Sequence, residues 1–165
     1  MTFEDRVRRL EDDRAIRDLK AAYLRAADTK DVAAMRDCFI PEATVAFEGL
    51  PTFTDRESFL ALYRQMACVP GIFDIHHGAN GVIRLEGDTR ATGRWSLLFH
   101  NINLAARSVT QMGVEYDDIY VREAGGGWRI AETRSRRISA LVHQVDDAGR
   151  PTVTAMGELA GAFGD

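Results

Sequence analysis

Apolar side chains in the first third of the chain recur at the three- and four-residue steps of a helix. Upstream of the main stretch, Val7 and Leu10 continue this spacing, but the charged run 12–14 interrupts the apolar face. We therefore expect a helix from about Ala15 to the vicinity of Asp28, preceded by a separate helical turn or a frayed lead-in. The apolar positions of this helix are Ile16, Leu19, Tyr23, Ala26 and Ala27.

Two shorter helical patterns follow, separated by a short β-like run over residues 43–47. The first pattern, over residues 31–39, begins at a favourable aspartate cap, and Pro41 is expected to end it. Ahead of the second pattern, Thr54 stands three residues before Glu57, which is the form of a capping box. The apolar positions of this third helix are Phe59, Leu62, Tyr63 and Met66.

From residue 73 to about 142 the pattern changes to long runs rich in β-branched and aromatic residues. Gly87-Asp88 and the glycine triplet 125–127 separate these runs, which predicts long antiparallel strands joined by tight turns. Three helices followed by a strongly curved antiparallel sheet make an α+β fold, a cone-shaped barrel with an apolar interior. We expect this domain to span residues 1–145, and residues 146–165 to form a tail that is partly ordered or packed on a partner.

Composition narrows the class of protein. The 165 residues are 45% hydrophobic and 28% charged, with a net charge of -4 and both signs interspersed. A clustered basic stripe is missing, which argues against a nucleic-acid or anionic-membrane surface. The sequence shows no apolar leader and no apolar run of membrane length, so the default expectation is a cytoplasmic protein. Cys38 and Cys68 have no CxxC spacing and no histidine at metal-site spacing, so we expect reduced thiols, no metal site and no disulfide framework.

Two of the four histidines, His76 and His77, lie side by side where the β-patterned region begins. Histidine is the usual proton-transfer side chain near neutral pH. Because strand residues alternate between faces, only one of the two points into the cone. Counting back from Ile83 favours His77, unless a bulge intervenes. A surface position is the alternative for either histidine.

Asp28 is the candidate partner of this histidine. A carboxylate near a helix C-terminus opposes the helix dipole at a cost of a few tenths to about 1 kcal/mol, so its position beside the apolar face suggests a function; the alternative is an aspartate that merely ends a helix. His76 and His100 are each 12 residues from position 88 in the turn, which places them opposite each other in an antiparallel pair. Arg134, on the last strand, is either an inward group that binds a substrate oxygen or part of a solvated arginine face.

The order of several short motifs over roughly residues 10–140 resembles the SnoaL-like branch of the nuclear-transport-factor-2-like superfamily. No single motif is specific, and the resemblance depends on their order and spacing together. The motifs are Tyr23 with Asp28, Phe39 with Pro41 and Ala43, His76 with Asn80, Gly87-Asp88, Tyr116 with Asp118 and Tyr120, and Trp128-Arg129-Ile130. The resemblance implies the same cone-shaped α+β fold.

Members of that family such as scytalone dehydratase, bile-acid 7α-dehydratase and hexachlorocyclohexane dehydrochlorinase are lyases that use an Asp–His dyad as base. The resemblance implies Asp28 and His76 for this dyad, because the family histidine stands four positions before the asparagine. Arg134 is one residue off the dehydrochlorinase spacing, and the lysine of that enzyme is replaced by Tyr23, which argues against that particular reaction. The substrate-binding positions that the resemblance implies are Tyr23, Asn80, His100 and Arg134.

The resemblance implies a lyase or isomerase that acts on a small, largely apolar, oxygenated ring compound without a metal or organic cofactor. Two other functions stay open. One is a non-catalytic ligand-binding or scaffold domain, because a fold does not determine a function; the other is a polyketide-type cyclase in which an acid works without the histidine. An open curved sheet leaves an edge and an outer face to cover, so we expect a homodimer or homotrimer.

Overall fold

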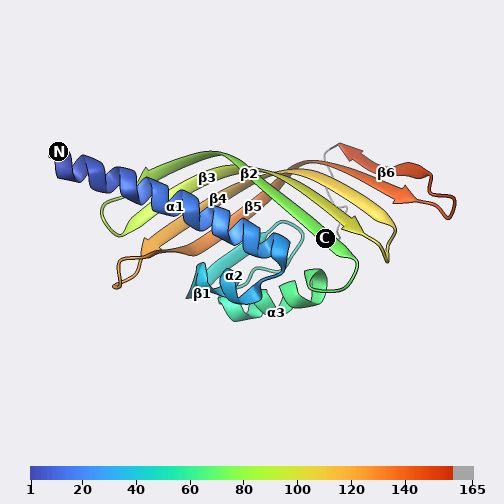
Figure 1. Cartoon of the computed structure of the whole chain (residues 1–165), viewed down its shortest axis with the longest axis horizontal. Coiled ribbons are helices and arrows are strands. Elements are labelled where there is room, and N and C mark those ends of the chain that lie inside the picture. Colours follow the sequence, from blue (N-terminus) through green and yellow to red (C-terminus); the bar gives the residue numbers. More distant parts are fainter. Residues whose placement is uncertain (158–165) are drawn as a thin grey trace.

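A long helix lies across the concave face of a curved six-stranded sheet (Figure 1). The computed structural model describes residues 1–157. The long helix α1 (Phe3–Thr29) is followed by two short helices, α2 (Val32–Asp37) and α3 (Arg56–Ala67), on the same side of the sheet. Within the described residues the convex face carries no helix (Figure 1). The predicted α+β class is confirmed.

Helix α1 is continuous through the charged run that interrupts its apolar pattern. Thr2 caps the helix in a capping box with Asp5, so that the first backbone N–H groups are satisfied. Within the charged run, Asp12 is buried, where it accepts hydrogen bonds from Trp128 Nε1 at 3.1 Å and from Arg122. The prediction of a separate helical turn or a frayed lead-in before Ala15 is therefore wrong. The hydrogen bonds that Asp12 accepts from the sheet stabilise the helix where an apolar side chain would otherwise pack.

The boundaries of the two short helices differ from the predicted ones. Helix α2 ends before Phe39, which is already the first residue of strand β1 (Phe39–Phe47). Pro41 lies inside this strand at a register shift, where a proline is tolerated, and so it does not end the helix. Helix α3 is capped by Asp55 instead of Thr54, because the Asp55 carboxylate accepts a backbone N–H of the first turn at 2.8 Å.

Four long strands form the predicted antiparallel meander. The strands are β2 (Ile72–Leu85), β3 (Arg90–Asn103), β4 (Ser108–Arg122) and β5 (Trp128–Val145). The spatial order is β1-β5-β4-β3-β2, and β1 runs parallel to β5, so the sheet is mixed at that edge. The sheet bends strongly without closing (Figure 1), which makes a cone with two free edges.

A sixth strand, β6 (Pro151–Gly157), lies within the segment predicted as a tail. It pairs antiparallel with the end of β5. The tail prediction is therefore wrong for residues 151–157, which extend the sheet, and residues 158–165 lie outside the described residues. No helix in the described part of the chain is both long and apolar enough to cross a membrane.

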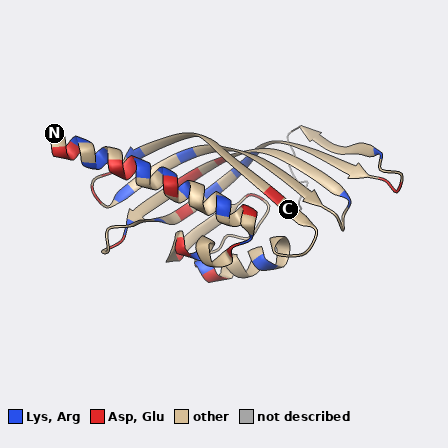
Figure 2. Cartoon of the chain, in the orientation of Figure 1, with Lys and Arg blue, Asp and Glu red and all other residues tan. Residues whose placement is uncertain are grey.

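The core lies between the helices and the concave face of the sheet. Edge-to-face aromatic pairs connect the layers: Tyr23 of α1 packs on Phe39 at 5.3 Å, and Phe47 packs on Phe59 of α3 at 5.6 Å and on Tyr116 at 5.8 Å, between ring centroids. Acidic and basic residues are interspersed along α1 (Figure 2), and most of them are exposed, whereas Asp12 and Lys20 are buried against the sheet. Four of these rings, those of Tyr23, Phe47, Phe59 and Tyr116, form part of the wall of an internal cavity.

Candidate active site

Asp28, in the last turn of α1, and His76, on β2, are joined by two hydrogen bonds. The His76 Nδ1–H donates to Asp28 Oδ1 at 2.7 Å, and the His76 backbone N–H donates to the same oxygen at 2.9 Å. Their side chains are 29% and 16% exposed, respectively. The structure thus brings together the two residues that the resemblance implies for the dyad.

The bond to Asp28 favours the tautomer of His76 that carries its proton on Nδ1. Nε2 then keeps a lone pair, and no residue among 1–157 hydrogen-bonds to it. The imidazole also packs against Phe99, with ring centroids 4.8 Å apart, which limits its rotation. A histidine held in this way can take a proton from a molecule bound beside it.

A β-bulge in β2 explains why His76, and not His77, faces inward. The pairing of β2 with β3 shifts by one residue within 79–82, and Asn80 there has a left-handed backbone with φ of 52°. The extra residue places His76 on the same face as Ile83 and leaves His77 exposed on the convex face. The preference for His77 from simple alternation is wrong for this reason.

The same bulge removes two other residues from the predicted site. His100 lies opposite Ile75 instead of opposite His76, and so it faces the convex side. Asn80 is exposed at the bulge, where its Nδ2–H lies 3.4 Å from Ser96 Oγ. The structure therefore contradicts the placement of His100 and Asn80 in a substrate site.

Arg134 also lies away from the cone interior. Its side chain is 55% exposed and pairs with Glu132 of the same strand, so its predicted role in substrate binding is contradicted. Arg137 lines the cavity instead, and its Nη2–H donates to Glu48 Oε1 at 3.2 Å. The two arginines are three positions apart on a regularly paired stretch of β5, so alternation places their side chains on opposite faces of the sheet.

The cone encloses a cavity of about 410 Å³, which His76 and Tyr23 both line. This volume lies in the range of roughly 300–1,000 Å³ that is usual for small-molecule sites. Polar side chains, including those of Asp74, Asn101 and Tyr116, interrupt a mostly apolar surface. The apolar wall includes Met35, Phe47, Phe59, Leu97, Phe99, Met112 and Val114.

A second charged pair lies beside the dyad. Lys30 forms the left-handed C-cap of α1, with φ of 60°, and its ammonium pairs with Asp74. Asp74 stands two positions before His76 on the same face of β2, and it also accepts a hydrogen bond from Asn101 Nδ2 at 2.7 Å. Sequence reasoning missed this pair. In the sequence, Lys30 follows Asp28 by two positions and Asp74 precedes His76 by two positions. This spacing is the sequence feature that could have identified the pair.

The surroundings of the cavity keep its histidine neutral and its tyrosines protonated. Burial lowers the pKa of His76 below its ordinary value, whereas the hydrogen bond and the charge of Asp28 act in the opposite direction. Burial raises the pKa of Tyr23 well above the ordinary tyrosine value, and it raises the pKa of Tyr116 as well. The cavity therefore offers one unprotonated base and two phenolic donors near neutral pH.

Comparison with known proteins places this fold and geometry in a family. A family model described as a SnoaL-like domain matches residues 8–134, which is most of the chain. The chain belongs to the SnoaL-like family. No curated protein sequence matches the chain.

Solved structures share the fold of this SnoaL-like protein at low sequence identity. A protein assigned as a scytalone dehydratase from Novosphingobium aromaticivorans is 19% identical with a TM-score of 0.74, over 81% of this chain and 88% of that one. A type 2 hexachlorocyclohexane dehydrochlorinase (LinA) is 18% identical with a TM-score of 0.73, over 94% and 97%. ActVI-ORFA from Streptomyces coelicolor is 14% identical with a TM-score of 0.64, over 74% and 94%. At these identities the likeness establishes the fold alone.

Behind the cavity wall, the SnoaL-like protein holds a buried ionic network. Lys20 Nζ lies 2.7 Å from Asp118 Oδ2 and 3.9 Å from the centre of the Tyr116 ring. The hydroxyls of Tyr120 and Thr133 each donate to Asp118 at 2.7 Å. Because both charges are buried and have partners, the network supports the strand that carries Tyr116. Asp118 and Tyr120 belong to one of the motifs of the family resemblance. Lys20 was not predicted, because a lysine does not contribute to the apolar pattern of α1.

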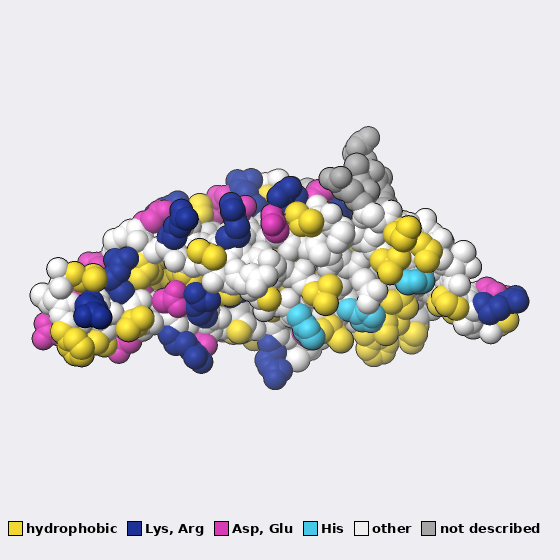
Figure 3. Space-filling view, turned by 90° about the horizontal axis from the view of Figure 1, so that it is seen from above, with side chains coloured by type: hydrophobic (Ala, Val, Ile, Leu, Met, Phe, Trp, Pro, Cys, Tyr) yellow, Lys and Arg dark blue, Asp and Glu magenta, His cyan; other side chains and the backbone are white. Residues whose placement is uncertain are grey.

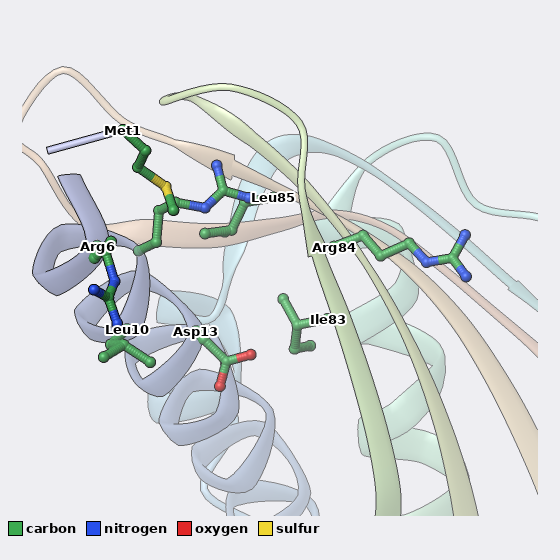
Figure 4. A pocket seen from close by; sticks show the side chains of 8 residues that line it. Met1, Arg6, Leu10, Asp13, Ile83, Arg84 and Leu85 are labelled. Atoms are coloured by element: carbon green, nitrogen blue, oxygen red, sulfur yellow. The ribbon is translucent and has the colours of Figure 1, made fainter.

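A second, more open depression of about 530 Å³ lies between the start of α1 and the end of β2. Ile83 and Leu85 line it, whereas the guanidinium of Arg84 points away from α1 (Figure 4). It shares no lining residue with the cavity at the dyad.

Within residues 1–157, no group of three or more His, Cys, Asp or Glu side chains is arranged to hold a metal ion, and both cysteines are free thiols. The dyad cavity is therefore the candidate active site of the SnoaL-like protein.

Proposed function

We propose that this protein is a cofactor-free lyase or isomerase of the dehydratase type, acting on a small, largely apolar, oxygenated ring compound. The observation that carries the proposal is the hydrogen-bonded pair of Asp28 and His76, which leaves Nε2 as an unprotonated nitrogen beside an apolar cavity of about 410 Å³. The dehydratase and dehydrochlorinase with the same fold are consistent with such an activity.

In the proposed reaction, His76 Nε2 removes a proton from a carbon next to a carbonyl group of the bound ring. The electron pair of the broken C–H bond forms a carbon–carbon double bond, and the C–O bond at the neighbouring carbon breaks. The imidazolium returns its proton to the departing hydroxide, so that water leaves and His76 is neutral again. The reaction involves no net oxidation or reduction, and the enzyme returns to its starting charge, so no external redox partner is needed.

Asp28 stabilises the positively charged state of His76 during this reaction. Its carboxylate already accepts the Nδ1–H in the resting protein, so little reorganisation is needed when the imidazolium forms. Negative charge develops on the substrate carbonyl oxygen when carbon loses its proton. The phenols of Tyr23 and Tyr116 line the same cavity and remain protonated, which makes them the proposed donors to that oxygen.

The cavity wall supports an apolar ring as the body of the substrate. Aromatic and aliphatic side chains from β1, β3 and β4, among them Phe47, Phe99 and Met112, surround the polar strip that contains His76. Burial of a hydrophobic ring against such walls contributes roughly 25 cal/mol per Å² of apolar surface. The charged residues at the cavity are already paired, Arg137 with Glu48 and Asp74 with Lys30. A strongly charged substrate would therefore have to displace one of these partners to compensate for its lost hydration.

The proposal is tested with a panel of cyclic β-hydroxy ketones, for which elimination of water creates a conjugated enone with a new ultraviolet absorbance. We expect turnover by the natural protein, loss of turnover in His76→Ala, and retained turnover in His77→Ala, because His77 lies on the opposite face of the strand. Thermal-shift measurements identify the panel members that bind. Binding without turnover in the natural protein would assign the cavity to a non-catalytic ligand-binding domain instead.

A further inference from the structure

Lys20 of α1 holds a buried positive charge behind the wall of the cavity at the dyad. Of the 21 basic residues in the chain, only Lys20 and Lys30 are lysines. Basic side chains project from the surface of the molecule into solvent (Figure 3), whereas Lys20 is 1% exposed. A lysine is almost never fully buried unless it is paired, because its ammonium loses hydration. The position of this charge therefore calls for a functional explanation.

The ammonium of Lys20 contacts one carboxylate and the face of one aromatic ring. It pairs with Asp118 at 2.7 Å and lies 3.9 Å from the centre of the Tyr116 ring. The centre of the Tyr23 ring is 5.3 Å away. A cation within about 6 Å of an aromatic ring is attracted to the electron density of its face, and the attraction is strongest where both groups are desolvated. The charge of Lys20 therefore acts on both rings.

These two tyrosines line the cavity, whereas Lys20 and Asp118 do not. Within residues 1–157, no hydrogen bond joins either of their hydroxyls to another protein group. The other two tyrosines of the chain, Tyr63 and Tyr120, each donate to a protein acceptor, at 2.6 Å and 2.7 Å. Because a buried hydroxyl normally has a partner, the two hydroxyls at the cavity are available to a bound molecule.

We propose that Lys20 is an electrostatic positioning residue that strengthens Tyr116 and Tyr23 as hydrogen-bond donors to an oxyanion in the cavity. This inference rests on the proposed function for the role of the two phenols. When a phenol donates to an oxygen that gains negative charge, its proton shifts toward that oxygen and its ring gains electron density. A cation fixed over the ring face attracts this ring more strongly than that of the resting phenol. Lys20 therefore stabilises the charged state more than the resting state, and such a difference accelerates a reaction.

Asp118 keeps Lys20 in place and also opposes its effect on the phenols. Burial lowers the pKa of Lys20, whereas the charge and the hydrogen bond of Asp118 raise it. The same carboxylate adds to the effect of burial in raising the pKa of Tyr23 and of Tyr116. Because Lys20 contacts the Tyr116 ring directly, it offsets the charge of the acid there. Removal of the Lys20 charge leaves the phenols with the unfavourable charge of Asp118 alone.

The ionisation of bound 4-nitrophenol tests the proposal without a substrate. This compound is a planar ring whose oxygen becomes negatively charged near neutral pH, and its anion absorbs visible light. The midpoint of its ionisation in the protein is therefore read from absorbance. Lys20→Gln keeps a hydrogen-bond donor for Asp118 but removes the charge. We expect this variant to raise the midpoint by about one pH unit, which is a roughly tenfold weaker preference for the anion.

Thr133→Val is the matched control. The Thr133 hydroxyl also donates to Asp118, at 2.7 Å, so this change disturbs the same carboxylate but leaves the charge of Lys20 in place, and the midpoint is expected to stay unchanged. The effect of Lys20→Gln is expected to shrink in a Tyr116→Phe background, because the charge acts through that phenol. Circular dichroism checks the fold of each variant, and Lys20→Met, which is uncharged and of similar length, replaces Lys20→Gln if the latter does not fold.

An unchanged midpoint in the folded Lys20 variant would overturn the proposal. Equal shifts in the Lys20 variant and in Thr133→Val would overturn it as well, because they would indicate a purely structural role. The measurement is separate from turnover. A protein that shows the expected shift but turns over no substrate would refute the proposed catalytic function and leave the role of Lys20 intact. An active protein without the shift would refute the role of Lys20 alone.

Discussion

Replacement of Asp28 by Asn isolates the electrostatic part of the proposed dyad. Asp28 Oδ1 accepts two hydrogen bonds, one from the His76 ring at 2.7 Å and one from the His76 backbone N–H at 2.9 Å. In Asp28→Asn the amide oxygen must stay in this position, because an NH₂ group there would face the backbone N–H. The ring therefore keeps its Nδ1–H tautomer, and only the negative charge is lost.

The expected magnitude follows from the hydrogen bond that remains. A hydrogen bond with a charged partner contributes about 1.5–3 kcal/mol, against about 0.5–1.5 kcal/mol for a neutral one. The imidazolium of His76 thus loses about 1–1.5 kcal/mol of stabilisation, which corresponds to roughly a tenfold fall in kcat/KM. A reversed tautomer would cost far more, about 10⁴-fold by analogy with catalytic triads.

The assay is a proton NMR titration of the imidazole Cε1–H signals, which needs no substrate. The chain has four histidines, and the His76→Gln spectrum identifies the signal of His76. Because the hydrogen bond and charge of Asp28 raise the pKa of His76, its midpoint in Asp28→Asn is expected to move further down. An unchanged or higher midpoint would refute the electrostatic role of Asp28.

Three other predictions follow from the same structure. Because burial lowers the pKa of His76 and the neutral ring is the base, the acidic limb of kcat/KM against pH is expected to have its midpoint below about 6.5; a midpoint above that value would contradict it. Gly81→Ala places a Cβ 2.3 Å from the Trp95 ring and is expected to cost about 1–3 kcal/mol in urea unfolding, whereas Gly125→Ala, with open space around it, is expected to change stability by less than about 0.5 kcal/mol. Asp118→Ala removes the partner of three buried groups and is expected to cost about 3–5 kcal/mol by the same assay.

Periodicity predicted the elements of this fold well, because helices and long strands leave regular apolar spacing. It failed where a polar residue has a distant partner. Asp12 interrupts the apolar face of α1, and the hydrogen bond from Trp128 that explains its burial joins residues 116 positions apart. No local pattern reports such a contact.

The candidate site was predicted only in part, for a related reason. A single extra residue near Asn80 reverses the facing of every position before it on β2. Alternation therefore selected His77, and simple counting placed His100 opposite His76. The family resemblance selected His76 because this histidine stands four positions before Asn80, a criterion that does not depend on strand alternation. It placed Asn80 itself in the site, where the structure has an exposed turn of the strand.

The most direct test of the proposed dyad is the protonation state of the two ring nitrogens of His76. Long-range proton–nitrogen correlation NMR of the free protein at neutral pH distinguishes a protonated ring nitrogen from an unprotonated one. The proposed base requires a proton on Nδ1, held by Asp28 at 2.7 Å, and a bare lone pair on Nε2. A proton on Nε2 at neutral pH would contradict the proposed catalytic role of His76.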